Sequence, residues 1–253
     1  MNVPERDGGM LTERFLRGHN DVALLPEERA VLERAVSEVK KLPARTTLVR
    51  HGDALHQSTL LVDGFIRRSI DDRDGQRQTV AVQVPGDFVD LHGYPLKKLD
   101  HDVVTLTAVR VAFVRHTDLD AITREHPTLT RKLWYATLLD AAMHREWLFR
   151  LGRLDAIERI SHFLSETNAR LKAIGLSDGH RFRLPITQTD LAEICGLTTV
   201  HVNRVLRQLR DDGLCTFKSS MVDIADPDQL ALRGQFDAGY LHLPWRDEPE
   251  AGR

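Results

Sequence analysis

Val200, Asn203, Arg204 and Arg207 stand at helical spacing near the end of the chain, and their side chains suit contacts with DNA bases. On a helix that turns about 100° per residue, these four fall within an arc of roughly 100°. Arginine pairs with guanine O6 and N7, asparagine with adenine, and an apolar group with the thymine methyl. We therefore expect a base-reading surface formed by Thr199, Val200, Asn203 and Arg204.

Polar and basic residues around this surface are candidates for contacts with the DNA phosphates, which hydroxyl and basic groups commonly bind. The candidates are Thr187, Thr189, His201, Arg207 and Lys218. The net charge of −2 over 253 residues counts against a nucleic-acid binder, but the local run of Arg204, Arg207 and Arg210 matters more than the sum.

Two short helices with a tight turn between them are predicted to position these residues. Thr187 with Asp190 resembles a capping box, with aspartate in place of the usual glutamate. The first helix should end at Gly196, and the second should begin near Thr198 or Thr199. The apolar face of the second helix consists of Val202, Val205, Leu206 and Leu209.

A hairpin is predicted directly after these helices. The stretch GLCTFKSSMVDIAD at 213–226 contains two β-rich runs separated by two serines. Such a hairpin fits a wing beside the second helix, and Lys218 at its tip would reach a phosphate.

The first half of the chain has a different sequence pattern. PEERAVLERAVSEV at 26–39 has helical spacing, and Pro26 suits a first helical turn. From about residue 43 to 115, short β-rich runs alternate with turn signals such as Asp-Gly at 63–64 and 74–75. Strands at this spacing predict an antiparallel roll or barrel.

A long helix is predicted at 129–153, and apolar residues cover most of its circumference. A surface helix needs one apolar face, so two faces indicate two packing partners. We expect the roll on one face and a second copy of the chain on the other, with the helix as a dimer spine. The alternative is a helix buried within one domain. The expected dimer contacts are Leu133, Ala136, Met143, Trp147 and Leu151.

These motifs together resemble the Crp/Fnr family of bacterial transcription regulators. The resemblance covers about residues 25 to 235 and rests on Gly64, GDF at 86–88, RLDAIERISHFL and the stretch at 186–214. It implies an α+β fold with an N-terminal antiparallel β-roll of the cyclic-nucleotide-binding type, a dimerisation helix and a C-terminal winged helix–turn–helix. It also implies a homodimer on palindromic double-stranded DNA, with RNA polymerase as an expected partner. Val200 departs from the family, because many members carry glutamate there.

The resemblance gives the expected division of the chain. Its parts are a flexible N-terminus at 1–22, a sensor-like roll at 23–127, the dimerisation helix at 128–153, the DNA-binding domain at 154–235 and a C-terminal tail at 236–253.

The ligand positions of the cyclic-nucleotide-binding members are degenerate in this chain. Those members use a glutamate for the ribose and an Arg-Ser pair for the phosphate. An ungapped comparison places Leu91 at the glutamate position, and His101 and Asp102 at the Arg-Ser pair. We expect no cyclic-nucleotide control and no cofactor. The alternative is a roll that senses haem, a metal or another small molecule, with His51 and His56, or His92 and His101, as its ligands.

Other function classes find little support in the residues. The two cysteines, Cys195 and Cys215, lack metal-ligand spacing, and Cys195 reads as core filler rather than a redox switch. No nucleophile elbow, Walker A, HExxH or dinucleotide fingerprint occurs, so we expect no enzymatic activity. No apolar run approaches the roughly 18 residues that span a bilayer, so we expect a cytoplasmic protein. A sensor that regulates through protein contacts remains the third class.

Overall fold

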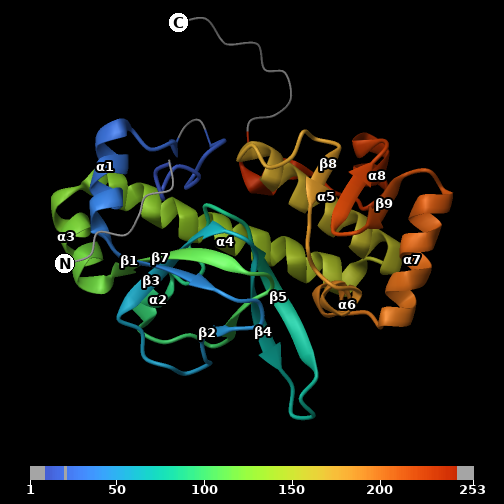
Figure 1. The fold of residues 1–253 in the computed structure, drawn as a ribbon, viewed down its shortest axis with the longest axis horizontal. Helices are drawn as coiled ribbons and strands as arrows, with labels where there is room; N and C mark the ends of the chain where they lie inside the picture. The colour runs from blue at the N-terminus through green and yellow to red at the C-terminus, as the bar shows by residue number, and fades with distance from the viewer. Residues whose placement is uncertain (1–8, 20–21, 244–253) are drawn as a thin grey trace, which may run out of the picture. The chain divides into compact units, whose positions relative to one another are not determined.

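The computed structural model describes residues 9–19 and 22–243, which fall into two compact units (Figure 1). The first unit comprises residues 9–17 and 24–138, and the second comprises residues 18–19, 22–23 and 139–243. Helices and antiparallel sheets both occur, which confirms the α+β class. Within the described part of the chain, no helix is long and apolar enough to cross a membrane.

The first unit is a roll of short strands with flanking helices, as predicted. Its elements are α1 (Pro26–Ala35), β1 (Val36–Leu42), β2 (Thr47–Val49), β3 (Gln57–Asp63), β4 (Ile66–Asp71), β5 (Arg77–Gln83), α2 (Gly93–Leu96), β6 (Asp102–Thr105), β7 (Val109–Arg115) and α3 (His116–Glu125). The long helix α4 (Pro127–Arg153) follows and contributes residues to both units.

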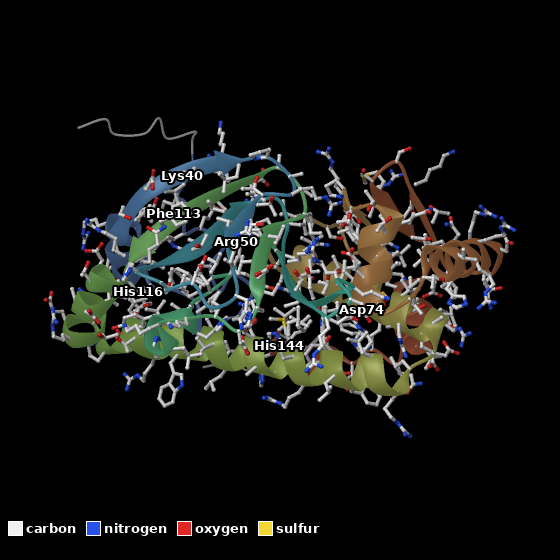
Figure 2. The ribbon with its side chains drawn as sticks, turned by 90° about the horizontal axis from the view of Figure 1, so that it is seen from below. Lys40, Arg50, Asp74, Phe113, His116 and His144 are labelled. Carbon is white, nitrogen blue, oxygen red and sulfur yellow. The ribbon has the colours of Figure 1, made fainter. Side chains whose placement is uncertain are left out.

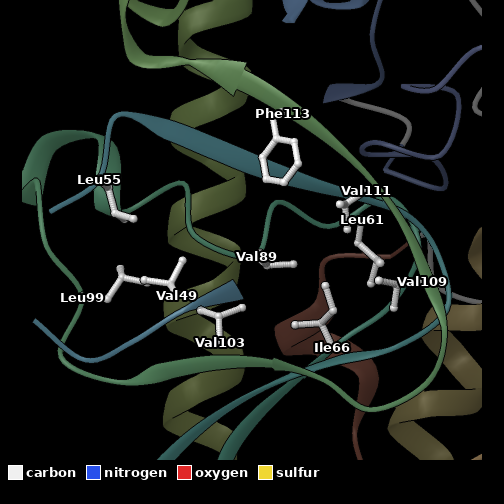
Figure 3. Close-up of a cluster of buried hydrophobic side chains, with 10 residues drawn as sticks. All are labelled: Val49, Leu55, Leu61, Ile66, Val89, Leu99, Val103, Val109, Val111 and Phe113. Carbon is white, nitrogen blue, oxygen red and sulfur yellow. The ribbon is translucent and has the colours of Figure 1, made fainter. Parts of the chain in front are cut away.

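Two antiparallel sheets enclose the core of the roll. Their strand orders are β1-β7-β3 and β2-β6-β4-β5. Leu61, Val111 and Phe113 from the first sheet share one buried cluster with Ile66 and Val103 from the second (Figure 3). Burial of this aliphatic surface is the main force that closes the roll.

The predicted Asp-Gly hairpin is present between β4 and β5. Asp72 Oδ1 accepts hydrogen bonds from the backbone N–H of Asp74 at 2.9 Å and of Gln76 at 2.8 Å. Gly75 has a φ of +77°, a conformation that glycine adopts without strain. Asp74 marks this turn in Figure 2. The local signal was therefore sufficient to predict the hairpin.

The helix predicted over 26–39 is present over residues 26–35, and the prediction is wrong for residues 36–39. Helix α1 ends at Ala35, and Val36 begins strand β1, in which Val39 pairs with Ala112 of β7. The Nζ of Lys40 lies 5.4 Å from the centroid of the Phe113 ring on that neighbouring strand (Figure 2). Valines spaced three apart fit a helix and a strand alike, and the distant strand β7 decides between them.

The expectation of a flexible N-terminus is wrong for residues 9–17. The ring of Phe15 is buried and lies 5.3 Å from the ring of Phe88. The backbone N–H groups of Leu11 and Thr12 donate to the carboxylate of Glu33, each at 3.0 Å. This segment therefore forms part of the packed roll. Residues 1–8 and 20–21 lie outside the described residues.

The second unit contains the rest of α4 and the predicted winged helix–turn–helix. Its further elements are α5 (Ala156–Ala173), β8 (Arg181–Arg183), α6 (Gln188–Cys195), α7 (Thr199–Asp211), β9 (Cys215–Lys218), β10 (Met221–Ile224), α8 (Pro227–Arg233) and the 3-10 helix η2 (Ala238–Leu241). The three strands form one antiparallel sheet in the order β8-β10-β9.

The predicted C-terminal tail at 236–253 is packed over its first part. Tyr240 in η2 donates from its hydroxyl to Glu166 Oε2 of α5 at 2.6 Å. The ring of Phe236 lies 5.4 Å from that of His162, also on α5. Residues 236–243 thus belong to the second unit, and residues 244–253 lie outside the described residues.

Candidate nucleic-acid interface

Helix α6 begins at the capping box that the sequence predicted. The side chain of Thr187 accepts from the backbone N–H of Asp190 at 3.1 Å, and Asp190 Oδ2 accepts from the backbone N–H of Thr187 at 2.7 Å. These two bonds satisfy N–H groups that a helix start leaves without partners. They fix the start of α6 at Gln188.

The turn between α6 and α7 has the conformation that its residues favour. Gly196 caps α6 with a φ of +61°, in the left-handed region where a side chain would be strained. Thr198 then caps α7, and its hydroxyl accepts from the backbone N–H of His201 at 3.3 Å. This confirms the predicted helix–turn–helix and places its second helix at Thr199–Asp211.

Helix α7 separates an apolar face from a polar one. Val202, Val205 and Leu209 are buried, as predicted, and Leu206 is half-buried. On the other side, the side chains expected to read bases all lie open: Thr199, Val200, Asn203 and Arg204. Val200 is 74% exposed, which is unusual for a valine and leaves its methyl groups free to contact a partner.

Two polar side chains near this surface already have intrachain partners. Asn203 Nδ2 donates to the carbonyl oxygen of Thr199 at 2.9 Å, which occupies one of the two N–H groups of its amide. Arg210 Nη2 lies 2.9 Å from Asp211 Oδ1, in an exposed ion pair that water weakens.

The predicted wing is a β-hairpin whose strands are joined by a two-residue turn. Its turn consists of Ser219 and Ser220, with φ values of +51° and +62°. Two positive φ angles in succession suit the twist of a tight hairpin, although glycine or asparagine is the usual residue there. Lys218 and Met221 form the pair that closes the turn, and Lys218 is exposed. The wing therefore presents a cation at its tip.

The other residues expected to contact phosphates lie on exposed positions, but they differ in how free they are. Thr189, His201 and Arg207 are exposed on α6 and α7. The hydroxyl of Thr187 is also exposed, yet it donates to Asp190 Oδ2 at 2.7 Å. Thr187 thus acts first as a helix cap.

Two arginines that the sequence analysis missed hold the carboxyl end of α6. Arg150 Nη2 donates to the carbonyl oxygen of Ile194 at 3.3 Å. Arg159 Nη1 donates to the carbonyl oxygens of Cys195 at 3.3 Å and Gly196 at 3.4 Å. Cations at this end stabilise a helix through its dipole. The position of Arg150 within an apolar stretch of its helix does not by itself distinguish it from an exposed arginine.

A buried polar network surrounds Arg150. The guanidinium carbon of Arg150 lies 3.9 Å from the Trp147 ring centroid, and Trp147 Nε1 donates to both oxygens of Glu166 at 3.1 Å. Burial lowers the pKa of His162 beside this network, so the imidazole favours its neutral form. The network ties α4, α5 and η2 together, because Tyr240 of η2 also donates to Glu166.

The five residues expected at a dimer interface do not share one exposed face of α4. Leu133 and Trp147 are buried within the chain, so the expectation for these two is wrong. The helix has two apolar faces, and Leu133 and Trp147 lie on the face that packs against the rest of the chain. Ala136, Met143 and Leu151 are half-buried. The large apolar side chains that α4 leaves exposed are Trp134 at 64%, Leu138 at 56%, Leu148 at 75% and Phe149 at 40%.

The degenerate ligand positions of the roll are engaged with their own neighbours. Leu91 is buried. His101 is buried, and its Nδ1 lies 2.7 Å from Asp100 Oδ1. Asp102 Oδ1 accepts from the backbone N–H of His51 at 2.7 Å. Asp102 thus holds a loop in place and adds negative charge near His101.

The histidine and cysteine candidates do not belong to a cluster of three or more potential metal ligands within the described residues. There, no group of three His, Cys, Asp or Glu side chains is placed to hold an ion. The rings of His92 and His101 lie 5.3 Å apart. Burial raises the pKa of Cys195 to about 11 and that of Cys215 to about 12, so both thiols stay protonated and unreactive.

Comparisons with protein families match both units. The Crp-like helix-turn-helix domain matches residues 158–233, and the cyclic nucleotide-binding domain matches residues 39–126. The transcriptional activator protein FnrL of Cereibacter sphaeroides is 31% identical over 193 residues, which cover 74% of this chain and 76% of FnrL. The activator Anr of Pseudomonas protegens is 26% identical, over 87% of this chain and 96% of Anr.

A solved structure shares the fold. FixK2 from Bradyrhizobium japonicum superposes with a TM-score of 0.70 at 23% identity, over 77% of this chain and 96% of that one. At this level of identity, the similarity concerns the fold.

Proposed function

The chain belongs to the Crp/Fnr family of transcription regulators, and from this premise we propose that it reads a specific DNA sequence with helix α7. The observation that carries the proposal is the division of α7 between a buried valine and leucine face and an exposed face with Val200, Asn203 and Arg204. A helix of this kind places its first turns in the major groove. Lys218 on the wing and Arg207 would contact the flanking phosphates.

The sequence preference follows from the exposed side chains. Arg204 would pair with guanine, Asn203 with adenine, and Val200 would contact a thymine methyl. Valine cannot accept a hydrogen bond from cytosine, as the glutamate of many family members can. The operator therefore differs from theirs at that base pair.

The working form would be a homodimer on an inverted repeat. Trp134, Leu138 and Leu148 recur at intervals of four and ten residues, which place them along one side of α4. Their exposure leaves an apolar stripe that a second copy of the helix would cover. Ala136 and Met143 lie on the opposite side of α4 from this stripe, roughly 160–180° around the helix from Trp134, and Leu151 lies about 100° from it. Two reading helices would then meet half-sites about 34–36 Å apart.

Control would not depend on a cyclic nucleotide. Leu91, His101 and Asp102 offer neither a ribose acceptor nor a paired arginine for phosphate. The roll at 23–127 would act as a scaffold or answer to another signal, with the dimerisation helix at 128–153 and the DNA-binding domain at 154–235. We further propose that the protein acts in the cytoplasm with RNA polymerase as a partner and has no enzymatic activity.

The experiment is selection of binding sites from random double-stranded DNA by the purified full chain, followed by fluorescence anisotropy on the selected site. We expect an inverted repeat and an affinity for it about a thousandfold above that for random DNA. Sedimentation on the same samples should give a dimer. Selection of no sequence, or a monomer on and off DNA at micromolar concentration, would refute the proposal.

A further inference from the structure

Helix α4 carries its exposed apolar side chains at the spacing of a coiled-coil seam. Such a seam repeats at alternating steps of four and three residues, so that one side of the helix meets its partner along the whole length. An unbroken series in α4 follows these steps: Trp134, Leu138, Ala141, Arg145, Leu148 and Gly152. At about 100° per residue these positions fall within an arc of roughly 80°. The seam is continuous, and one of its members is a cation.

The seam is open within the chain. Trp134, Leu138 and Leu148 are exposed, and a methyl group added at Gly152 would meet no other part of the described chain within 4 Å. Arg145 is exposed as well, and none of the described residues forms an ion pair with it. Its guanidinium is therefore available to a partner that covers the seam.

The proposed homodimer requires two copies of α4 that run in the same direction. The helix–turn–helix follows α4 in each chain, and both reading helices must enter the same duplex from one side. A two-fold axis between parallel helices brings each seam residue against its own copy. Arg145 of one chain then faces the partner's Arg145.

The residues beside Arg145 along the edges of the seam do not neutralise this pair of cations. They are Ala142, His144 and Phe149, and none of them is acidic. In coiled coils these edge positions commonly carry the glutamates that pair with basic residues of the partner. The two arginines therefore meet without a carboxylate between them.

The two carboxylates of α4 are turned toward their own chain. Asp140 and Glu146 each lie more than roughly 100° around the helix from the middle of the seam. Asp140 Oδ2 lies 3.8 Å from His144 Nδ1, and Glu146 Oε1 lies 3.9 Å from the buried His162 Nε2. Neither carboxylate reaches the place where the two copies of Arg145 meet.

We propose that Arg145 sets the affinity of the homodimer, because it faces its own copy across the seam and the repulsion between the two cations keeps the dimer weak. The inference rests on the proposed homodimer and identifies the contact that limits its stability. A charged residue at one seam position lowers the stability of a coiled coil. Salt screens the repulsion, so the affinity of the dimer should rise with ionic strength.

The first experiment mixes the full unaltered chain with an equal amount of the full Arg145→Glu chain. Arginine meets glutamate only in the mixed dimer, whereas each homodimer opposes two like charges. Native mass spectrometry distinguishes the three dimers by mass. The mixed dimer should be at least about five times as abundant as the two homodimers together, because its charges are complementary. Random pairing would make these two amounts equal.

The second experiment removes the charge alone. Arg145→Gln keeps a polar side chain, and it should tighten the dimer about three- to fivefold in sedimentation equilibrium, the value of one exposed charge pair. Arg153→Gln is the matched control, because it removes the same charge from an exposed site about 100° around the helix from Trp134. It should leave the affinity unchanged.

The salt dependence separates repulsion from other effects of these substitutions. From about 0.1 M to about 1 M sodium chloride the Debye length falls from about 10 Å to about 3 Å. The unaltered dimer should tighten severalfold more over this range than the Arg145→Gln dimer does. Circular dichroism should show the same fold for all variants, because each changes an exposed side chain.

The outcomes that would overturn the inference differ from those that would overturn the homodimer. Random pairing in the mixture, or equal tightening by Arg145→Gln and Arg153→Gln, would show that Arg145 does not face its own copy and would leave the homodimer in place. An unaltered chain that stays a monomer, both alone and with the Arg145→Glu chain, would overturn the inference together with the proposed homodimer.

Discussion

Arg150 near the end of helix α4 donates from Nη2 to the carbonyl oxygen of Ile194 in the last turn of α6, at 3.3 Å. The guanidinium is fully buried, with its carbon 3.9 Å from the centroid of the Trp147 ring and 5.6 Å from that of the Phe163 ring. A single side chain thus connects the proposed dimer helix with the helix that precedes the reading helix. Its stacked, planar group suits arginine and not lysine.

Arg150→Ala should lower the free energy of unfolding by about 2–5 kcal/mol, because it leaves a cavity beside the Trp147 and Phe163 rings and removes the hydrogen bond to Ile194. Urea denaturation measures this change. Arg153→Ala, on the same helix but exposed, should stay within about 0.5 kcal/mol. Equal effects of the two substitutions would contradict a special role for Arg150.

Arg204 and Lys218 should behave differently as DNA contacts. Arg204→Ala should cost about 1–3 kcal/mol per half-site and relax the preference for one guanine. Lys218→Ala should weaken binding to all DNA sequences by the same factor. It should also reduce the salt dependence of binding by the amount expected for about one phosphate contact. Anisotropy on specific and random DNA at several salt concentrations separates the two. Equal losses on both DNAs for Arg204→Ala would remove its base-reading role.

The reading helix and its supports could be predicted because their signals are local. Thr187 with Asp190, the left-handed Gly196 and the alternating faces of α7 lie within one short stretch. The prediction that the first helix continues to Val39 was wrong for the opposite reason. Residues 36–39 form a strand because they pair with β7, which lies far along the chain. The burial of Phe15 was missed for the same reason, because no neighbouring residue in the sequence indicates its contact with Phe88.

The face of α4 could not be predicted from spacing alone. Apolar residues surround the helix, so the sequence indicates two partners without assigning a face to each. Trp147 turns inward because its indole N–H finds the carboxylate of Glu166, while Trp134 stays exposed. The buried Arg150 was missed because a cation within an apolar stretch reads as an exposed residue until its stacking partners are placed.

The exposed stripe on α4 should be the dimer contact. Leu138→Glu removes apolar burial worth about 1.5–3 kcal/mol and places a charge at the interface, so the dimer should dissociate about a hundredfold more readily. Sedimentation velocity over a concentration series measures this. Arg153→Glu, at an exposed site of the same helix about 100° around from Trp134, should leave the dimer intact. A Leu138→Glu variant that remains dimeric would move the interface elsewhere.

Asp90 should make the stability of the roll depend on pH. Burial raises the pKa of Asp90 from 3.8 to about 6, although Thr59 donates to its carboxylate and Arg68 lies near. The folded state then binds the proton more tightly than the unfolded state. The free energy of unfolding should therefore fall by about 2 kcal/mol as pH rises from 4 to 6, and change little above that. Asp90→Asn should remove this slope in urea titrations, and an unchanged slope would contradict the assignment.

Cyclic AMP and cyclic GMP should neither bind nor alter DNA affinity at physiological concentration. A buried phosphate needs charge-assisted donors, but His101 already pairs through Nδ1 with Asp100, and Asp102 adds a negative charge held by the backbone of His51. Leu91 cannot accept a hydrogen bond from the ribose, which would leave a buried hydroxyl at a cost of about 1–3 kcal/mol. Isothermal titration with both nucleotides is the measurement, with Lys98→Ala as a control for nonspecific charge effects. Micromolar binding that His101→Ala abolishes and Lys98→Ala retains would show that the roll still recognises the phosphate.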